Sequence, residues 1–161
     1  MKGDGAFLPD LKDGVSSAKN LMKKYIEPKF IYTGQMFEFD VFGDPVLKNN
    51  GEKKSLFEAI LEVKRNQGSW DPTDPNTRFA NDLHALICDR LKLENYSELK
   101  FYKALGGGLD WYYGADGFFE LGDRRVFIDL TLRNKKLRDT VEIHPDDVLE
   151  NIADTIAEQL S

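Results

Sequence analysis

The chain is 161 residues long, carries a formal net charge of −6 and contains a single cysteine. This length predicts one domain over residues 1–161, with enough chain to bury a hydrophobic core. The negative charge argues against a protein that coats nucleic acid indiscriminately, but it leaves room for a local basic site. Because a lone cysteine, Cys88, cannot form an internal disulfide, the composition agrees with a reducing cytoplasm.

The sequence shows no sign of two common targeting signals. No apolar run approaches the roughly 18 residues that a transmembrane helix needs. The N-terminal stretch MKGDGAFLPD lacks the apolar segment of a secretory signal peptide. We therefore expect a cytoplasmic protein that has no membrane partner.

Residues 1–54 are expected to form an N-terminal extension with strands at 29–42. In the second half of that stretch, apolar and polar residues alternate with the period of a β-strand, as Phe37, Phe39 and Val41 against Glu38, Asp40 and Phe42. We predict strands over 29–33 and 36–42, joined around Gly34.

Two helices are predicted next. Ser55 followed three residues later by Glu58 is typical of a capping box, so the first helix should run from Ser55 to about Gln67. The second helix should begin at Asn76 or Thr77 and run to about Glu94, because its apolar residues recur at helical spacing.

Three side chains in this region are interpreted as structural. Trp70, in the loop between the two helices, is interpreted as a lid over the core rather than as a stacking surface. His84 is interpreted as a lone histidine that is structural or exposed, and Cys88, within a helical segment, is interpreted as a packing residue. We therefore assign neither of them to a metal site or to nucleophilic catalysis.

A strand over Leu99–Leu105 is predicted to end at three glycines, Gly106 to Gly108. The glycines are interpreted either as a flexible connector or as a place where the backbone approaches a ligand. They do not form a phosphate-binding loop, because no Gly-Lys-Ser/Thr sequence follows them.

The most informative stretch is 116–132, which predicts a β-hairpin. Strands over Asp116–Leu121 and Arg124–Leu132 are joined by Gly122-Asp123, and a glycine-led two-residue loop fixes the register. The expected pairs are Leu121/Arg124, Glu120/Arg125, Phe119/Val126, Phe118/Phe127, Gly117/Ile128 and Asp116/Asp129. A three-residue loop would instead shift the register by one residue and separate the two aspartates.

The expected Asp116/Asp129 pair is the unusual feature of this hairpin. Directly opposed residues hold their Cβ atoms ~4.5–5.5 Å apart, and two charges ~5 Å apart repel by roughly 3 kcal/mol at an effective dielectric near 20. A shared proton, a nearby Arg or Lys cation, or a bound divalent metal would offset this repulsion. A metal is the most specific of these options, since Mg²⁺ is typically held by one or two carboxylates.

The chain after the hairpin predicts a brief strand over Val141–Ile143 and a final helix that opens at Pro145. Apolar residues recur every four positions in that helix, at Val148, Ile152, Ile156 and Leu160, so the helix should pack on the sheet. Positive charge is concentrated between Arg124 and Arg138. This basic stretch is interpreted either as a solvated strand end or as a track for phosphates.

The order helix, strand, Asp-bearing strand, Asp-x-Thr strand and helix resembles the core of the PD-(D/E)XK nuclease superfamily. The residues that carry the resemblance are Asp116 in GADGFFE and Asp129 in VFIDLT, and the resemblance covers roughly residues 77–160. It implies an α+β, restriction-endonuclease-like core with a mixed or antiparallel sheet flanked by helices. It also implies that Asp116, Asp129 and the carbonyl of Leu130 bind Mg²⁺ or Mn²⁺.

The chain departs from the family pattern at Thr131, which stands where the family has a lysine. In relatives that lose this lysine, a basic residue from elsewhere is thought to act in its place. Lys135 is the first candidate here, because it shares strand parity with Asp129, and Lys136 is the second. Thr131, Arg133 and Lys136 are the expected substrate-binding residues.

Three functional interpretations remain open. The first is a metal-dependent nuclease that acts on DNA or RNA, with Asp116, Asp129 and Lys135 as its catalytic residues. The second is a catalytically degenerate nuclease-like domain that serves as a protein- or nucleic-acid-interaction module. The third is a different α+β fold, in which Asp129 pairs with Arg133. A homodimer is a further candidate assembly.

Overall fold

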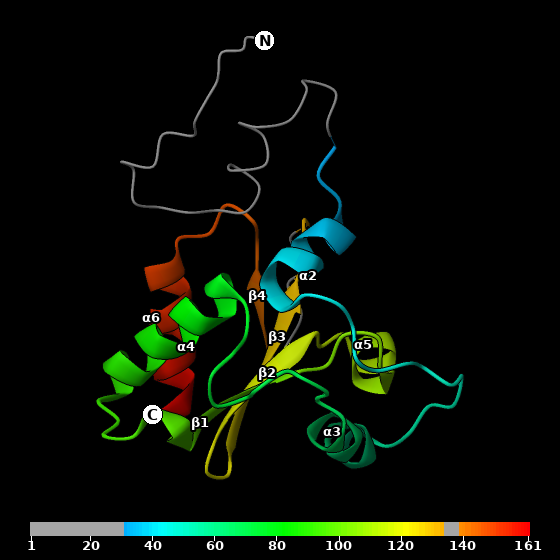
Figure 1. Ribbon diagram of the computed structural model, residues 1–161, viewed down its shortest axis with the longest axis horizontal. Helices are drawn as coiled ribbons and strands as arrows, with labels where there is room; N and C mark the ends of the chain where they lie inside the picture. The colour runs from blue at the N-terminus through cyan, green and yellow to red at the C-terminus, as the bar shows by residue number, and fades with distance from the viewer. Residues whose placement is uncertain (1–30, 134–138) are drawn as a thin grey trace, which may run out of the picture.

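Figure 1 shows the computed structural model of the protein, which describes residues 31–133 and 139–161. The elements follow in the order α2 (Gly34–Phe42), α3 (Leu56–Arg65), α4 (Arg78–Leu91), a short 3-10 helix (Tyr96–Glu98), β1 (Leu99–Lys103), α5 (Gly108–Tyr113), β2 (Gly117–Leu121), β3 (Arg124–Leu130), β4 (Thr140–Ile143) and α6 (Leu149–Leu160). The four strands form a mixed sheet in the order β1-β2-β3-β4. β2 is antiparallel to β1 and β3, whereas β4 is parallel to β3. The predicted α+β class, with a mixed sheet flanked by helices, is confirmed.

Helices cover both faces of the sheet. α4 and α6 lie on one face, and α3 and α5 lie on the other (Figure 1). Alternate side chains of β2 and β3 point to opposite faces of the sheet. Phe119 and Val126 pack with α4 and α6, whereas Phe118 and Phe127 pack with α3 and α5. This division is the one that the hairpin register predicted.

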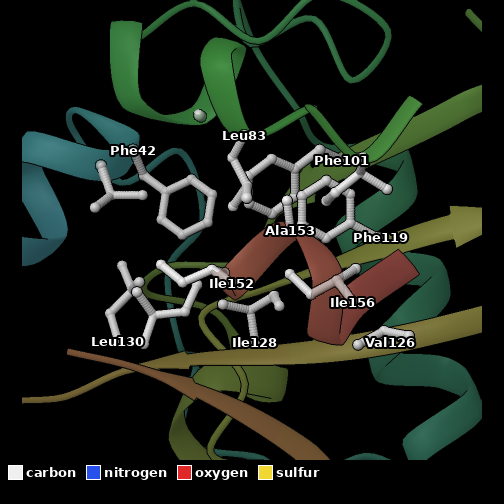
Figure 2. Close-up of a cluster of buried hydrophobic side chains, with 14 of the residues drawn as sticks. Phe42, Leu83, Phe101, Phe119, Val126, Ile128, Leu130, Ile152, Ala153 and Ile156 are labelled. Atoms are coloured by element: carbon white, nitrogen blue, oxygen red, sulfur yellow. The ribbon is translucent and has the colours of Figure 1, made fainter. Parts of the chain in front are cut away.

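The larger core lies between the sheet and the pair α4 and α6. Figure 2 shows Ile152, Ala153 and Ile156 of α6 beside Ile128 and Leu130 of β3. Leu160 of α6 is also buried, so the four-residue spacing correctly predicted the packed face of α6 at Ile152, Ile156 and Leu160. The predicted start at Pro145 is wrong, because the helix begins at Leu149 and Val148 is its N-cap.

The prediction of strands at 29–42 is wrong where the structure describes this stretch, because residues 34–42 form the helix α2. The Thr33 hydroxyl accepts a hydrogen bond from the Met36 N–H and thereby caps the helix N-terminus. Phe37 and Val41, four residues apart, are both buried, while Phe39 is 57% exposed. Residues 29 and 30 lie outside the described part of the chain.

A buried lysine fixes the end of α2. Lys103 of β1 is 5% exposed, and its Nζ donates hydrogen bonds to the carbonyls of Phe42 (3.0 Å) and Asp44 (2.8 Å). The first bond satisfies a carbonyl that the helix leaves unpaired at its C-terminus, and the second holds the chain just beyond the C-cap Gly43. The Lys103 ammonium also lies 4.9 Å from the centre of the Trp70 ring. Trp70 is itself 3% exposed, which confirms its interpretation as a core residue.

The two predicted helices that follow are confirmed. α3 begins at the capping box of Ser55 and Glu58, with both reciprocal hydrogen bonds present. α4 begins after Thr77, whose hydroxyl accepts from the Ala80 N–H. His84 is buried in α4 with its Nε2 2.7 Å from the Leu99 carbonyl, which agrees with its structural interpretation.

The predicted Glu120/Arg125 pair forms part of a three-residue ion-pair network on the α3 side of the sheet. Glu120 binds Arg125 of β3 at 2.6 Å and Lys64 of α3 at 2.8 Å, and its side chain is 10% exposed. Burial alone would raise the pKa of Glu120, but hydrogen bonds from Lys64 and Arg125 outweigh it and hold the pKa below its ordinary value.

We expect Glu120→Gln to lower the free energy of unfolding by about 2 kcal/mol at neutral pH, between the values for surface and fully buried ion pairs. Because the folded-state pKa of Glu120 is lowered, this contribution is present above the unfolded pKa and is lost as the pH falls through the folded pKa. Urea denaturation at neutral and at acidic pH measures the effect, with Glu94→Gln at an exposed position as the control. An equal loss at both pH values would contradict the ionic origin of the stabilisation.

Among the described helices, none has both the length and the apolar character required to traverse a bilayer.

Candidate active site

The hairpin that carries the two predicted site aspartates has the expected register. Pairing runs from Leu121/Arg124 to Gly117/Ile128, so the two-residue loop at Gly122-Asp123 is confirmed and the three-residue alternative is excluded. The regular ladder ends at Gly117, one residue before the expected Asp116/Asp129 pair. β3 also ends at Leu130 rather than at Leu132.

Asp116 is tied to β3 by its own backbone and side chain. Its N–H donates to the Ile128 carbonyl at 2.8 Å, and its Oδ2 accepts from the Leu130 N–H at 2.7 Å. Leu130 follows Asp129 directly, so the carboxylate of Asp116 lies against the peptide that joins Asp129 to Leu130. The two aspartates are therefore neighbours, and both are buried, at 2% and 3% exposure.

The surroundings of Asp116 disfavour its charge. Burial, a side-chain hydrogen bond with Asp110 and the charge of Asp110 together raise the pKa of Asp116 to about 10. The Leu130 N–H lowers this pKa and Glu38 raises it, both to a smaller extent. At neutral pH the Asp116 carboxyl is therefore protonated, and its hydrogen bond with Asp110 is one cause of the raised pKa. The sequence suggested that a proton, a nearby cation or a metal would offset the repulsion between carboxylates. Among the described residues, a proton on Asp116, hydrogen-bonded to Asp110, does so.

Asp110 was missed from the sequence because it lies on α5, a helix that was not predicted. The preceding glycines shape the entry to this helix. Gly106 has φ +87°, and a Cβ there would lie 2.5 Å from the Leu47 carbonyl oxygen. The Gly106 N–H donates to Asp110 Oδ2 at 3.0 Å. The glycines therefore let the backbone at Gly106 come close to the backbone at Leu47 of the same chain.

Asp129 has a second acidic neighbour on the other side of β3. The parallel pairing of β3 with β4 places Glu142 beside Asp129, and the Glu142 side chain is 10% exposed. His144, two residues further along, holds its Nε2 3.6 Å from Glu142 Oε1 and its Nδ1 3.4 Å from Asp147 Oδ2. The sequence signal for these residues was the alternation Thr-Val-Glu-Ile-His, which puts Glu142 and His144 on one face.

Of the predicted substrate-binding residues, the structure describes Thr131 and Arg133. Thr131 is 5% exposed, and its hydroxyl is engaged with the backbone of Arg133, donating to the carbonyl (2.9 Å) and accepting from the N–H (3.1 Å). Arg133 is exposed. Lys135 and Lys136 lie outside the described residues. Because β3 ends at Leu130, the strand parity that related Lys135 to Asp129 does not extend to it.

The described carboxylates limit what kind of metal site can form. Within residues 31–133 and 139–161, no three His, Cys, Asp or Glu side chains converge closely enough to hold a metal ion by themselves. A site built from Asp116, Asp129 and the Leu130 carbonyl would need only two side chains. This is the usual number for Mg²⁺, which keeps several waters.

Comparison with known proteins found no matching family model, no similar curated protein and no similar solved structure.

Proposed function

We propose that this protein is a metal-dependent phosphodiesterase that cleaves nucleic acid, of the PD-(D/E)XK type. The observation that carries the proposal is the gathering of Asp110, Asp116 and Asp129 where β2 begins and β3 ends. Clustered carboxylates in a buried place destabilise a fold unless a proton or a cation neutralises them. A carboxyl that binds a cation takes up a proton when the cation is missing, and the raised pKa of Asp116 is what such a site should show.

The donor set fits a hard divalent cation. Asp116 and Asp129 would hold Mg²⁺ or Mn²⁺, with the Leu130 carbonyl as a third oxygen. When bound, such an ion activates a water molecule and stabilises charge on the phosphate. Asp116 would give up its proton on binding the ion, while the Gly106 N–H would keep the Asp110 carboxyl in place beside it. Arg133, exposed just beyond β3, would bind a neighbouring phosphate.

In this proposal Lys135, or Lys136 as the second candidate, would act in place of the family lysine; both lie outside the described residues. Thr131 cannot supply a charge, and its hydroxyl is already used by the Arg133 backbone. We therefore retain Thr131 as a residue that holds the turn after β3 and positions Arg133.

The second candidate function is an interaction module that retains the fold without catalysis. Two observations favour it: the absence of a lysine at Thr131, and the satisfaction of the Asp116 carboxyl by the Leu130 N–H and Asp110. Such contacts maintain the fold without any cation. The two functions differ in whether the native protein binds a divalent metal.

Calorimetric titration with Mn²⁺ tests the proposal. We expect the wild type to bind Mn²⁺ and Asp129→Asn to bind it at least tenfold more weakly, because one of two carboxylate ligands loses its charge. Asp123→Asn, in the exposed hairpin loop, is the matched control and should bind as the wild type does. Cleavage of a labelled DNA or RNA in Mn²⁺, abolished by Asp129→Asn, would establish the nuclease. If the wild type binds no Mn²⁺ and cleaves no substrate, the nuclease proposal is rejected and the interaction module becomes the better explanation.

The proposed compartment is the cytoplasm. Cys88 is buried, and burial together with the charge of Asp89 raises the pKa of its thiol to about 12. The thiol is therefore an inert packing group that requires no oxidising environment. Sedimentation analysis tests whether the chain forms the homodimer considered above.

A further inference from the structure

The loop between α2 and α3 contains the sequence Asn49-Asn50-Gly51, in which Asn50 is the one asparagine of the chain that glycine follows. Asn50 and Gly51 are both exposed. Figure 1 shows the loop projecting from the molecule beside α3 and α5. An asparagine followed by glycine marks a turn. It also places a backbone nitrogen that no side chain shields next to the amide group of the asparagine.

The loop is anchored to α5 on both sides of this sequence. Before it, Leu47 packs beside the glycines that precede α5, since a Cβ at Gly107 would lie 3.1 Å from Leu47 Cβ. After it, the Lys53 ammonium lies 5.4 Å from the centre of the Tyr113 ring, and the Tyr113 hydroxyl donates to the Lys54 carbonyl at 2.7 Å. The segment between these contacts is therefore held at both ends while it stays open to water.

Backbone N–H groups of this segment bind the side-chain oxygens of both asparagines. The Glu52 N–H donates to Asn50 Oδ1 at 3.0 Å, and the Gly51 N–H donates to Asn49 Oδ1 at 3.1 Å. The first bond places a donor on the oxygen where negative charge develops when a nucleophile attacks Asn50 Cγ. The second bond is exposed to water and contributes little net free energy, so it opens readily and frees the Gly51 nitrogen.

The surroundings of Gly51 leave that attack unobstructed. Gly51 has φ +88°, a conformation that favours glycine, and nothing lies within 4 Å of the place that a Cβ would take. The Gly51 nitrogen and Asn50 Cγ belong to adjacent residues, so their reaction closes a five-membered ring. Attack within one molecule is strongly favoured over attack from solution. Asn49 has the same kind of hydrogen bond, but the residue after it carries a side chain that hinders the approach.

We propose that Asn50 is a site of spontaneous deamidation, in which the Gly51 nitrogen displaces the side-chain amide as ammonia. The nitrogen loses its proton to hydroxide and forms a bond to Asn50 Cγ, and the Cγ–Nδ2 bond breaks as the leaving group takes a proton from water. Water then opens the cyclic imide at either carbonyl and leaves aspartate or isoaspartate, each of which adds a negative charge to the loop. This inference goes beyond the proposed function and does not depend on it.

Peptide mapping by mass spectrometry, after incubation of the full-length protein at mildly alkaline pH, tests the inference. We expect Asn50 to convert to aspartate and isoaspartate while Asn49, in the same peptide, stays unchanged. Asn50→Gln should abolish the conversion, because the longer side chain would have to close a larger ring. Asn49→Gln is the matched control and should still convert at Asn50. Gly51→Ala should slow the conversion about tenfold, which corresponds to about 1.4 kcal/mol in activation free energy.

The same measurement on the chain unfolded in urea shows whether the fold leaves Asn50 reactive. A rate in the folded protein that is comparable with the rate in the unfolded chain supports the inference. If Asn50 stays intact in the folded protein and converts only after unfolding, the fold protects this residue and the inference is overturned. Equal conversion of Asn49 and Asn50 overturns it as well, since the glycine would then have no role. Ion-exchange chromatography gives an independent readout, because the acidic variant that it resolves should be missing from Asn50→Gln.

Discussion

Gly117→Ala is expected to lower the free energy of unfolding by about 3 kcal/mol, at the upper end of the usual cost of overpacking a core. An alanine Cβ at this position would lie 2.7 Å from Phe42 Cζ and 2.7 Å from the Tyr102 carbonyl oxygen. Phe42 is 1% exposed and packed against Trp70 and Phe101 at ring distances of 5.4 and 5.2 Å, so its ring has little room to move. The Tyr102 carbonyl belongs to the backbone of β1 and cannot move without the strand.

Intrinsic β-strand propensity alone would predict that Gly117→Ala stabilises the protein, which is the opposite of the expected result. A glycine inside a strand is normally a weak point, so alanine at an unobstructed site would stabilise the strand by a few tenths of a kcal/mol. Steric overlap is the larger effect here. Gly34→Ala, at a position with nothing within 4 Å of the added Cβ, is the matched control and should leave stability within about 0.5 kcal/mol of the wild type. Denaturant midpoints measure both variants, and an unchanged midpoint for Gly117→Ala would mean that β1 and β2 separate easily.

Features determined by neighbouring residues could be predicted from the sequence. The capping box at Ser55, the packed face of α6 and the hairpin register all depend on contacts within a few residues. The hairpin is the clearest example, because the glycine-led loop Gly122-Asp123 favours one register, and the structure excludes the three-residue alternative. The proximity of Asp116 to Asp129 follows from that register.

The error at α2 has a physical cause. The apolar residues Phe37, Phe39, Val41 and Phe42 satisfy a period of two and a helical spacing together, so periodicity cannot decide between strand and helix. Contacts far along the chain decide it instead. Lys103, from a strand about sixty residues away in sequence, binds the carbonyl of Phe42 at the end of α2 and that of Asp44 just beyond it. Tertiary packing thus overrides the local strand preference of these residues.

The candidate site was predictable only in part for the same reason. Asp110 lies on a helix of six residues, which is too short for a periodic pattern, and it follows three glycines. Glu142 reaches Asp129 through a parallel pairing of β3 with β4, and sequence patterns alone do not indicate which strands pair in parallel. The sequence therefore predicted the two aspartates on the hairpin, while the acidic residues that surround them depend on the tertiary fold.

Asp116→Asn is expected to stabilise the protein, by an amount that grows with pH. In the folded protein the pKa of Asp116 is raised to about 10, whereas the unfolded chain returns it to its ordinary value of 3.8. The wild type must therefore take up a proton on folding between these two values, and stability is lost as the pH rises through this window. Asparagine has no charge to neutralise. Its amide oxygen can accept from the Leu130 N–H, and its amide nitrogen can donate to Asp110.

The difference in unfolding free energy between Asp116→Asn and wild type should increase by up to about 1.4 kcal/mol per pH unit, the limit for one linked proton. Urea denaturation across the range from mildly acidic to mildly alkaline pH measures this slope. Asp123→Asn removes an exposed carboxylate from the same hairpin and should show no such trend. A divalent cation at the proposed site would substitute for the proton, so Mn²⁺ should raise the stability of the wild type at alkaline pH and leave Asp116→Asn unchanged. Should the variant prove less stable than the wild type at every pH, Asp116 is ionised in the folded protein, and its assignment as a protonated carboxyl must be abandoned.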